Sequence, residues 1–429
     1  MSLQEVLQND FQAYQQQADD NSFSQLRKKA YAEFEKLGFP TTKHEEWKYT
    51  NLKPIAEQKF QSTCEVNLSA IELFKASPLS HLEANVLVFV NGTFVEQASK
   101  IIEQEASIVI TTVAQARIKH AEVFTKHFGK YANIEGMAMN ALNTALLSDG
   151  AFIYVPASKS IQHPVIIYHI TDSTSIHSLS QPRNLFVLEK NANAQVIESY
   201  VSTGDLKSFT NVVNEVYADE QAQLELYKIQ QQSGDAYHNN FTQVFQEGNT
   251  NINHVTLTLD GNWTRNNLHF YMNGENCNTL LYGLYVTDGK QFVDNHTRVD
   301  HAKPNCFSDE KYKGVLKDKS VAVFNGKIMV HLDAQKTNAY QRNQNILLSD
   351  EATVNTKPQL EIFADDVKCT HGATIGQLDE EPMFYLRSRG IPENVARKLL
   401  LNAFADDIAE KIKIPELVAI MEEQIEKKI

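Results

Sequence analysis

The chain has 429 residues, enough for two or three domains and a large hydrophobic core. Its 40 Lys and Arg residues stand against 53 Asp and Glu residues, which gives a net charge of −13. This acidic balance disfavours nucleic acid or an anionic membrane as the main partner, because both bind positively charged surfaces. No stretch of the sequence approaches the ~20 apolar residues that span a bilayer, and the N-terminal residues lack the basic and apolar regions of a secretion signal. We therefore expect a protein of the bacterial cytoplasm that binds neither membrane nor nucleic acid.

The first forty residues predict two helices. Apolar residues within 3–14 recur at helical spacing, and a second apolar face follows within 23–37. Ser22 and Gln25 predict a capping box at the start of the second helix, and Gly38 predicts its end.

From about residue 150 to residue 375 the sequence predicts short β-strands with almost no helical periodicity. Runs rich in Val, Ile, Tyr, Phe and Thr cover Phe152–Val155, Val165–Ile170, Gln223–Lys228, His254–Leu259, Leu280–Val286, Val321–Phe324 and Ile328–Val330. Turns are predicted at Asp260-Gly261, Asp288-Gly289 and Asn325-Gly326, and Asn91-Gly92 predicts a hairpin further upstream. More than two hundred residues of strand exceed one small sandwich and favour a β-solenoid, although a two-sheet sandwich or a propeller stays open.

Helices are predicted again beyond residue 378. Asp379 predicts a helix N-cap and Gly390 the end of that helix, and two more helices are expected to begin near Pro392 and Pro415. We expect three domains: an N-terminal helical and mixed domain over 1–135, a β core over 136–375 and a C-terminal helical domain over 376–429.

The sequence lacks the short signatures of several common enzyme classes. It contains no P-loop, no Gly-x-Gly-x-x-Gly, no Gly-x-Ser-x-Gly and no His-Glu-x-x-His. We expect no catalytic residues and no tightly bound cofactor. A β-solenoid enzyme that acts on a polymeric substrate remains an alternative, because polysaccharide lyases use such folds and many of their sites leave no short motif.

Four cysteines, Cys64, Cys277, Cys306 and Cys369, lie far apart and form no Cys-x-x-Cys pair. At this chain length and cysteine density a disulfide framework is implausible. Cys277 and Cys306 are preceded by turn-like sequence, and we interpret both as structural thiols.

Cys369 and His371 form the strongest candidate site. In a strand these two residues point to the same face, with Cα atoms about 7 Å apart. Thiolate and imidazole both suit iron or zinc, but two ligands do not complete a cluster shell. A cluster at this site would then need ligands from another subunit, be transient, or be absent. On spacing alone, a buried thiol beside a hydrogen-bonded histidine is the more frequent arrangement.

A second group of potential ligands comprises His296, Asp300 and His301. Because His296 and His301 are five residues apart, they fall on opposite faces of a regular strand. We interpret this group as solvated or hydrogen-bonded residues rather than as a metal site.

The segment 383–389 combines aromatic and basic residues on a short helix: Phe384, Tyr385, Leu386, Arg387 and Arg389. Tyr and Arg are favoured at protein interfaces, so a docking helix and ordinary core packing are both consistent with this pattern.

Several ordered runs between Asp294 and Ile391 carry a family resemblance. They are Asp294-Asn295-His296-Thr297, Tyr312-Lys313-Gly314-Val315-Leu316, Phe324-Asn325-Gly326, Ala334-Gln335-Lys336-Thr337, the run 355–362 and the run 384–391. These runs resemble the SufB/SufD family of iron–sulfur cluster assembly scaffold proteins. Lys368-Cys369-Thr370-His371 and the run Glu45–Thr50 are similar to the SufD branch, whereas the cysteine typical of SufB-like chains is missing from the run 352–356.

The resemblance implies a right-handed parallel β-helix between two helical domains, and a scaffold without catalysis of its own. It implies pairing with SufB through the β-helix and docking of the SufC ATPase by Phe384, Tyr385, Leu386, Arg387 and Arg389. It also implies a transient iron–sulfur cluster shared with SufB, to which His371 and Cys369 contribute. A homodimer of the isolated chain is compatible with the same exposed surface, and a structural protein in which Cys369 and His371 are merely packed stays open.

Overall fold

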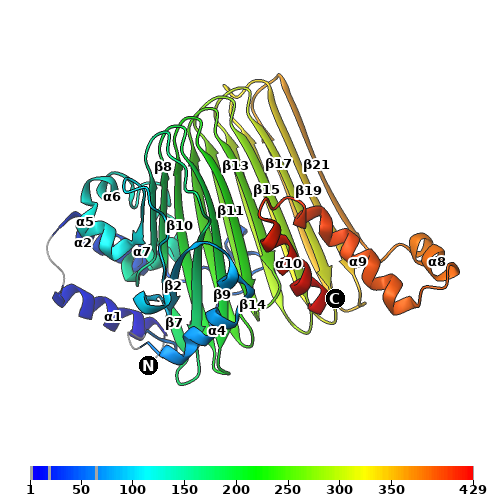
Figure 1. Ribbon diagram of the computed structural model, residues 1–429, viewed down its shortest axis with the longest axis horizontal. Helices are drawn as coiled ribbons and strands as arrows, with labels where there is room; N and C mark the ends of the chain where they lie inside the picture. The colour runs from blue at the N-terminus through cyan, green and yellow to red at the C-terminus, as the bar shows by residue number, and fades with distance from the viewer. Residues whose placement is uncertain (1–2, 18–20, 63–65, 429) are drawn as a thin grey trace.

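Two long parallel sheets lie face to face along the molecule, with helices at both ends of the chain (Figure 1). The computed structural model describes residues 3–17, 21–62 and 66–428, so Cys64 lies outside the described residues. Successive strands alternate between the two sheets, and each turn of the chain adds one strand to each sheet. The predicted β-solenoid is confirmed, with about eight turns between the helical ends.

The strands of the solenoid stack in register with parallel pairing. The first sheet contains β5 (Ala151–Val155), β8 (Arg183–Leu188), β10 (Ser208–Ala218), β12 (Ala236–Gln246), β14 (Trp263–Met272), β16 (Phe292–His301), β18 (Val321–Val330) and β20 (Thr353–Ile362). The second contains β6 (Val165–Asp172), β9 (Asn193–Thr203), β11 (Gln223–Gln231), β13 (Asn251–Thr258), β15 (Asn278–Thr287), β17 (Phe307–Leu316), β19 (Thr337–Leu347) and β21 (Val367–Gly376). Short strands β1 (Gln61–Ser62) and β7 (Ser178–Ser180) pair at the edge of the first sheet.

The N-terminal part of the chain contains short helices that pack against the first turns of the solenoid. They are α1 (Leu3–Gln17), α2 (Ser22–Leu37), η1 (Glu45–Trp47), α3 (Lys53–Ala56), η2 (Leu68–Ile71), α4 (Glu72–Ala76), η3 (Pro78–His81), η4 (Glu96–Ala98), α5 (Val113–Lys119), α6 (Ala121–His127) and α7 (Ala138–Leu146). The prediction of Ser22 as the cap of α2 was wrong. Asn21 has the extended backbone of an N-cap and its side chain accepts a hydrogen bond from Ser24 N at 3.0 Å. Gly38 ends the helix with a φ of 63°.

The hairpin predicted at Asn91-Gly92 is confirmed. It joins β2 (Asn85–Val90) to β3 (Thr93–Phe94) in antiparallel pairing, and both turn residues have positive φ. A further antiparallel strand, β4 (Val109–Thr112), pairs with β5 on the other sheet. These antiparallel strands close the N-terminal end of both sheets.

The turn predicted at Asn325-Gly326 was wrong, because β18 runs without interruption from Val321 to Val330. The glycine is needed for packing instead. A Cβ atom at Gly326 would lie 2.3 Å from the Gln341 side-chain nitrogen and 2.8 Å from the Phe324 ring. Gly326 therefore makes room inside the solenoid for a buried polar side chain from the opposite sheet.

Three helices complete the chain: α8 (Glu380–Ser388), α9 (Glu393–Ala409) and α10 (Pro415–Lys428). The predicted cap Asp379 accepts a hydrogen bond from Glu381 N at 3.0 Å. Helices α9 and α10 bury apolar side chains such as Leu401 and Leu417 against the outer face of the second sheet. Helix α8 projects beyond them and has no buried residue (Figure 1). Within the described ranges, no helix has the length and apolar character needed to span a bilayer.

We predict that Gly326→Ala lowers the free energy of unfolding by about 1–3 kcal/mol, because the added methyl group overpacks the interior. Gly372→Ala is the matched control, since a Cβ atom on that strand glycine meets no atom within 4 Å. Urea unfolding of both variants measures the difference. Equal stability of the two variants would contradict the packing role of Gly326.

Candidate functional site

Cys369 and His371 lie on β21, the last strand of the second sheet. Their register partners on β19 are Ala339 and Gln341, both of which are buried. Because paired residues of parallel neighbours share a face, both candidate ligands belong to the row of side chains that faces the solenoid interior. Cys369 and His371 therefore lie on the same face of β21, as their spacing predicted.

The two candidate ligands differ in their surroundings. Cys369 is half-buried and packs against the apolar core of the solenoid, and this burial raises the pKa of its thiol. A thiolate at this position therefore needs a cation to replace its proton. His371 is exposed to solvent. The imidazole is thus the more accessible of the two donors.

Glu310 lies in the interior below His371, two strands further down the same sheet. It is fully buried, accepts a hydrogen bond from Gln341 Nε2 at 2.8 Å, and is hydrogen-bonded to Thr297. Burial raises the pKa of Glu310 to about 7. A carboxyl group that titrates near neutrality is therefore held two turns from the end of the solenoid. Glu310 could not be predicted as a neighbour of this site from the sequence, because only the strand register brings it into line with His371.

The interior polar groups continue deeper into the solenoid. Lys228 Nζ lies 3.2 Å from Glu198 Oε2 and 2.7 Å from Asn240 Oδ1, and all three residues are buried. Tyr200 donates a hydrogen bond to the same carboxylate at 2.6 Å. These groups satisfy one another, which is how a buried charge is tolerated.

The C-terminal end of the solenoid is open. Strands β20 and β21 are the last strands of their sheets, and no described residue pairs with their outer edges. Apolar side chains are exposed beside these edges: Ile362, Phe363 (59% exposed) and Ile375. Unpaired edges and exposed apolar side chains together are typical of a surface that another chain covers.

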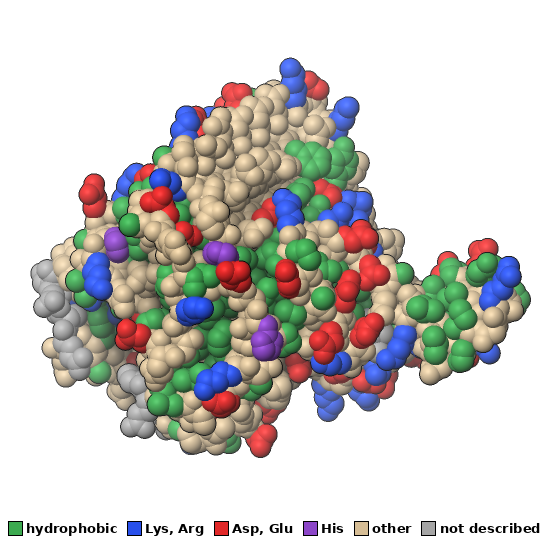
Figure 2. Space-filling model, in the orientation of Figure 1, with side chains coloured by type: hydrophobic (Ala, Val, Ile, Leu, Met, Phe, Trp, Pro, Cys, Tyr) green, Lys and Arg blue, Asp and Glu red, His purple; other side chains and the backbone are tan. Residues whose placement is uncertain are grey.

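Helix α8 carries the other group of residues predicted to bind a partner. Phe384 is 74% exposed and Tyr385 is 57% exposed, and Figure 2 shows apolar side chains gathered on this protruding lobe. Arg389 lies 5.3 Å from the centre of the Tyr385 ring, and Arg387 pairs with Glu393 at 3.3 Å. Leu386 is half-buried. Core packing does not explain why two aromatic side chains are exposed to solvent, so these exposures favour the interpretation of α8 as a docking helix.

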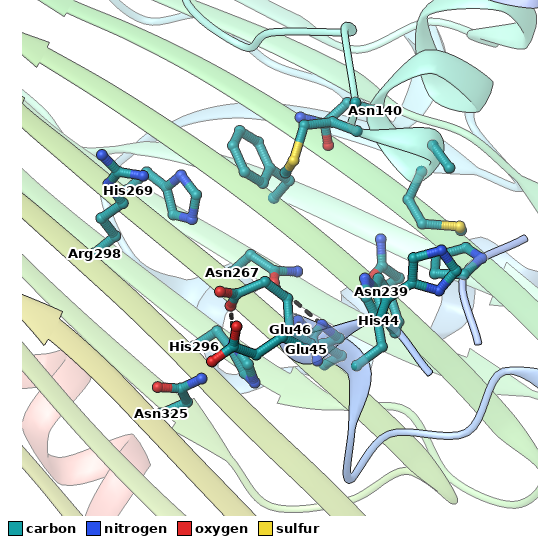
Figure 3. A pocket seen from close by; sticks show the side chains of 18 of the residues that line it. His44, Glu45, Glu46, Asn140, Asn239, Asn267, His269, His296, Arg298 and Asn325 are labelled. Atoms are coloured by element: carbon teal, nitrogen blue, oxygen red, sulfur yellow. Dashed lines mark hydrogen bonds and ion pairs between the residues drawn. The ribbon is translucent and has the colours of Figure 1, made fainter. Parts of the chain in front are cut away.

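A cavity of about 490 Å³ lies on the outer face of the first sheet, beneath the segment that follows α2 (Figure 3). His269, His296 and Asn267 line it from the strands, and Glu45 and Glu46 line it from the covering segment. Its volume suits a small molecule. This cavity could not be predicted from the sequence, because His269 and His296 lie more than two hundred residues from Glu45 and Glu46 in the chain.

The covering segment contains the motif Glu45–Thr50 and is fixed by the motif that begins at Asp294. Arg265 is buried, forms an ion pair with Asp294, and stacks on Trp47 at 3.9 Å. Thr50 hydrogen-bonds to Asp294 as well. His296 contacts Glu46 at 3.4 Å, and this hydrogen bond lowers the pKa of Glu46 to about 2. Two of the motifs that carry the family resemblance, Glu45–Thr50 and the run that begins at Asp294, therefore bind each other in the folded chain.

The remaining sequence candidates lie apart from the open end. His296 faces outward and His301 inward on β16, as their spacing predicted; burial lowers the pKa of His301 to about 3, and its ring contacts Ser308 at 2.9 Å. Cys277 and Cys306 are buried at one corner of adjacent turns, and both thiols donate to Gly274 O. In the part of the chain that the structure describes, no three His, Cys, Asp or Glu side chains are grouped as a metal site.

We predict that Glu310→Gln flattens the pH dependence of stability. The carboxyl ionises near pH 4.5 in the unfolded chain and near pH 7 in the fold. The wild-type chain therefore loses roughly 3 kcal/mol of unfolding free energy as pH rises through this interval, and the loss persists above pH 7. The variant lacks this titration, so relative to the wild-type chain it is more stable at pH 8 than at pH 5. Urea unfolding at both pH values checks this, with the exposed Glu351→Gln as the control. If the difference in unfolding free energy between Glu310→Gln and the wild-type chain were the same at pH 5 and pH 8, the prediction would be contradicted.

Comparison with known proteins identifies the family. A model of the SufBD core domain of SUF system FeS cluster assembly matches residues 169–404, and a model of the SufBD protein N-terminal region matches residues 2–167. An iron–sulfur cluster assembly SufBD family protein of Synechocystis sp. is 33% identical over 89% of this chain and 85% of its own. The iron–sulfur cluster assembly protein SufD of Escherichia coli is 32% identical over 88% of this chain and 86% of its own, and SufD of Bacillus subtilis is 26% identical over 75% of both chains.

The core-domain model alone covers more than half of the sequence, and two relatives above 30% identity align with most of it. The chain therefore belongs to the SufBD family of iron–sulfur cluster assembly proteins and is a homologue of SufD.

Proposed function

We propose that this chain is a non-catalytic scaffold subunit that carries one half of a binding site for a nascent iron–sulfur cluster. The other half comes from SufB, which pairs with the open end of the solenoid, and the SufC ATPase docks on α8. The observation that carries the proposal is the open end itself, where no described residue pairs with the outer edge of β20 or β21 and His371 is exposed on β21. The complex acts in the bacterial cytoplasm.

The number of donor atoms at the open end supports a shared site. His371 offers one imidazole nitrogen and Cys369 one sulfur, whereas the irons of a cluster need more ligands than two. Cys369 needs its proton displaced before it binds a metal, so His371 is the primary ligand and Cys369 the secondary one. The cluster is cargo in this arrangement, held transiently and passed on rather than retained by the isolated chain.

The pairing surface is supported by the geometry of the last turn. Strand β20 contains Pro358, which lacks a backbone N–H group, and Pro is tolerated at edge strands. Strand β21 has no such interruption and exposes Ile375 beside its edge. A second solenoid end with the same features would cover these groups, and in the absence of SufB a copy of this chain is the available partner.

The docking surface on α8 is supported by its side chains. Aromatic residues and arginine contribute most to binding energy at protein interfaces, and Phe384, Tyr385, Leu386, Arg387 and Arg389 combine both types within one short helix. The helix is held away from the solenoid by α9, which leaves room for a globular partner (Figure 1).

We predict that His371→Ala lowers the iron and sulfide content of the complex reconstituted anaerobically with SufB and SufC by at least tenfold. Cys369→Ala has a smaller effect, because its thiol is half-buried and protonated. Thr370→Ala is the matched control, since Thr370 lies on the same strand with its side chain on the opposite face. Iron and sulfide are counted per complex. Normal cluster content in His371→Ala would rule out the half-site and favour a purely structural role for these residues.

We predict that replacing Phe384 and Tyr385 by Ala weakens the binding of SufC by roughly thirtyfold or more, as expected when a cluster of interface hot spots loses about 2 kcal/mol. Ile118→Ala is the control, because Ile118 is 75% exposed on α5 at the other end of the molecule. Titration calorimetry with purified SufC measures both variants. Unchanged affinity of the double variant would place the SufC site elsewhere.

A further inference from the structure

Three interior side chains form a row that leads to the candidate ligand. Glu310 on β17 pairs in register with Gln341 on β19, and Gln341 pairs in register with His371 on β21. Neighbouring parallel strands lie about 4.8 Å apart, so adjacent members of the row are within reach of a side-chain hydrogen bond. Glu310 and Gln341 are fully buried, and His371 is the exposed end of the row.

The amide of Gln341 is fixed on one side and unpartnered on the other. Its Nε2 atom donates to Glu310 Oε2 at 2.8 Å, whereas its buried Oε1 atom has no hydrogen-bond partner among the described residues. A buried carbonyl oxygen without a hydrogen-bond partner is destabilising, so a donor is expected near it. The next side chain of the row beyond this oxygen is the imidazole of His371, whose ring N–H is a donor.

The surroundings hold Gln341 in this orientation. Gly326 faces it from the opposite sheet at a distance that excludes any Cβ atom, so the amide is confined between the two sheets. At a pH at which Glu310 is ionised, reversing the amide would turn its carbonyl oxygen toward the carboxylate oxygens of Glu310 and lose the bond that Gln341 donates. Glu310 is itself held by Thr297 on the opposite sheet. Three residues from three strands therefore determine where Oε1 lies.

We propose that Gln341 is a positioning residue for His371: its side-chain carbonyl oxygen accepts the ring N–H of His371, and Glu310 fixes Gln341 for this task. The hydrogen bond selects one tautomer of the imidazole and one orientation of the ring. The ring nitrogen that remains unprotonated points out of the open end of the solenoid.

This arrangement prepares the ring to bind a metal. A histidine that binds a metal through one nitrogen usually donates its other N–H to a carbonyl or carboxylate, and loss of that partner costs roughly 10–100-fold in metal affinity. The consequence for iron rests on the proposed function, because it assumes that His371 is a ligand. The hydrogen bond between Gln341 and His371 does not rest on it.

The tautomer of His371 tests the hydrogen bond directly. The full chain is labelled with ¹⁵N-histidine, and the two ring nitrogens are observed by NMR at a pH at which the ring is neutral; the signal that disappears in His371→Ala assigns the residue. Gln341→Leu removes the acceptor at similar volume. Gln344→Leu is the matched control, because it makes the same change on the opposite face of β19.

We expect a single tautomer in the wild-type chain and in Gln344→Leu, and a mixture in Gln341→Leu. The double variant Glu310→Gln/Gln341→Glu exchanges the amide and the carboxyl group and keeps an acceptor beside His371, so it retains the single tautomer. A tautomer mixture already present in the wild-type chain would overturn the proposal without any variant. An unchanged tautomer in folded Gln341→Leu would overturn it as well.

A second measurement separates this inference from the proposed function. In the complex with SufB and SufC, Gln341→Leu should lower cluster content by at least tenfold and the exchanged pair should restore it. Loss of the single tautomer in Gln341→Leu, together with normal cluster content in both Gln341→Leu and His371→Ala, would support the positioning role and overturn the cluster half-site. Loss of clusters in His371→Ala alone, with the tautomer of Gln341→Leu unchanged, would do the reverse.

Discussion

The backbone hydrogen bonds between successive turns are the constraint on which the molecule depends. Each turn satisfies the N–H and C=O groups of the turn before it, so a solenoid of finite length has two ends at which a row of such groups is left without a strand. The N-terminal end is closed by antiparallel strands β3 and β4. The C-terminal end has no equivalent strand among the described residues, and the candidate ligands lie on it. The architecture and the site therefore have one origin.

Much of the secondary structure was predictable from local sequence. Helical apolar spacing located α1 and α2, the caps Asp379 and Gly38 located helix ends, and Asn91-Gly92 located the hairpin. These signals depend on residues a few positions apart. The turn predicted at Asn325-Gly326 was wrong because an Asn-Gly pair can also lie within a strand, where the glycine makes room for a neighbouring side chain. Only the packing of Gln341 from the opposite sheet distinguishes the two cases.

The repeat of the solenoid was not predictable, because the turns differ in length. Asn251 pairs with Asn278, which is 27 residues further on, whereas Phe307 pairs with Asn338, which is 31 residues further on. The alignment of Glu310, Gln341 and His371 cannot be predicted without knowing which residues pair between successive turns. Cys369 and His371 were found because they are two residues apart; the groups that surround them were missed because they are about thirty residues apart.

The regular spacing of the strands also fixes the distance between the C-terminal helices and the open edge of the solenoid. Helix α9 is fastened to β17 by Lys311 and Lys313, which both contact Asp407, at 2.9 Å and 2.8 Å. The open edge lies two strands beyond β17 in the same sheet, an offset of roughly 10 Å at the usual strand spacing. Loops at the corners can lengthen or shorten without altering this offset. Only the gain or loss of a whole solenoid turn after β17 would change the offset. Evolution can therefore vary the corner loops freely while the distance between the C-terminal helices and the open edge stays constant.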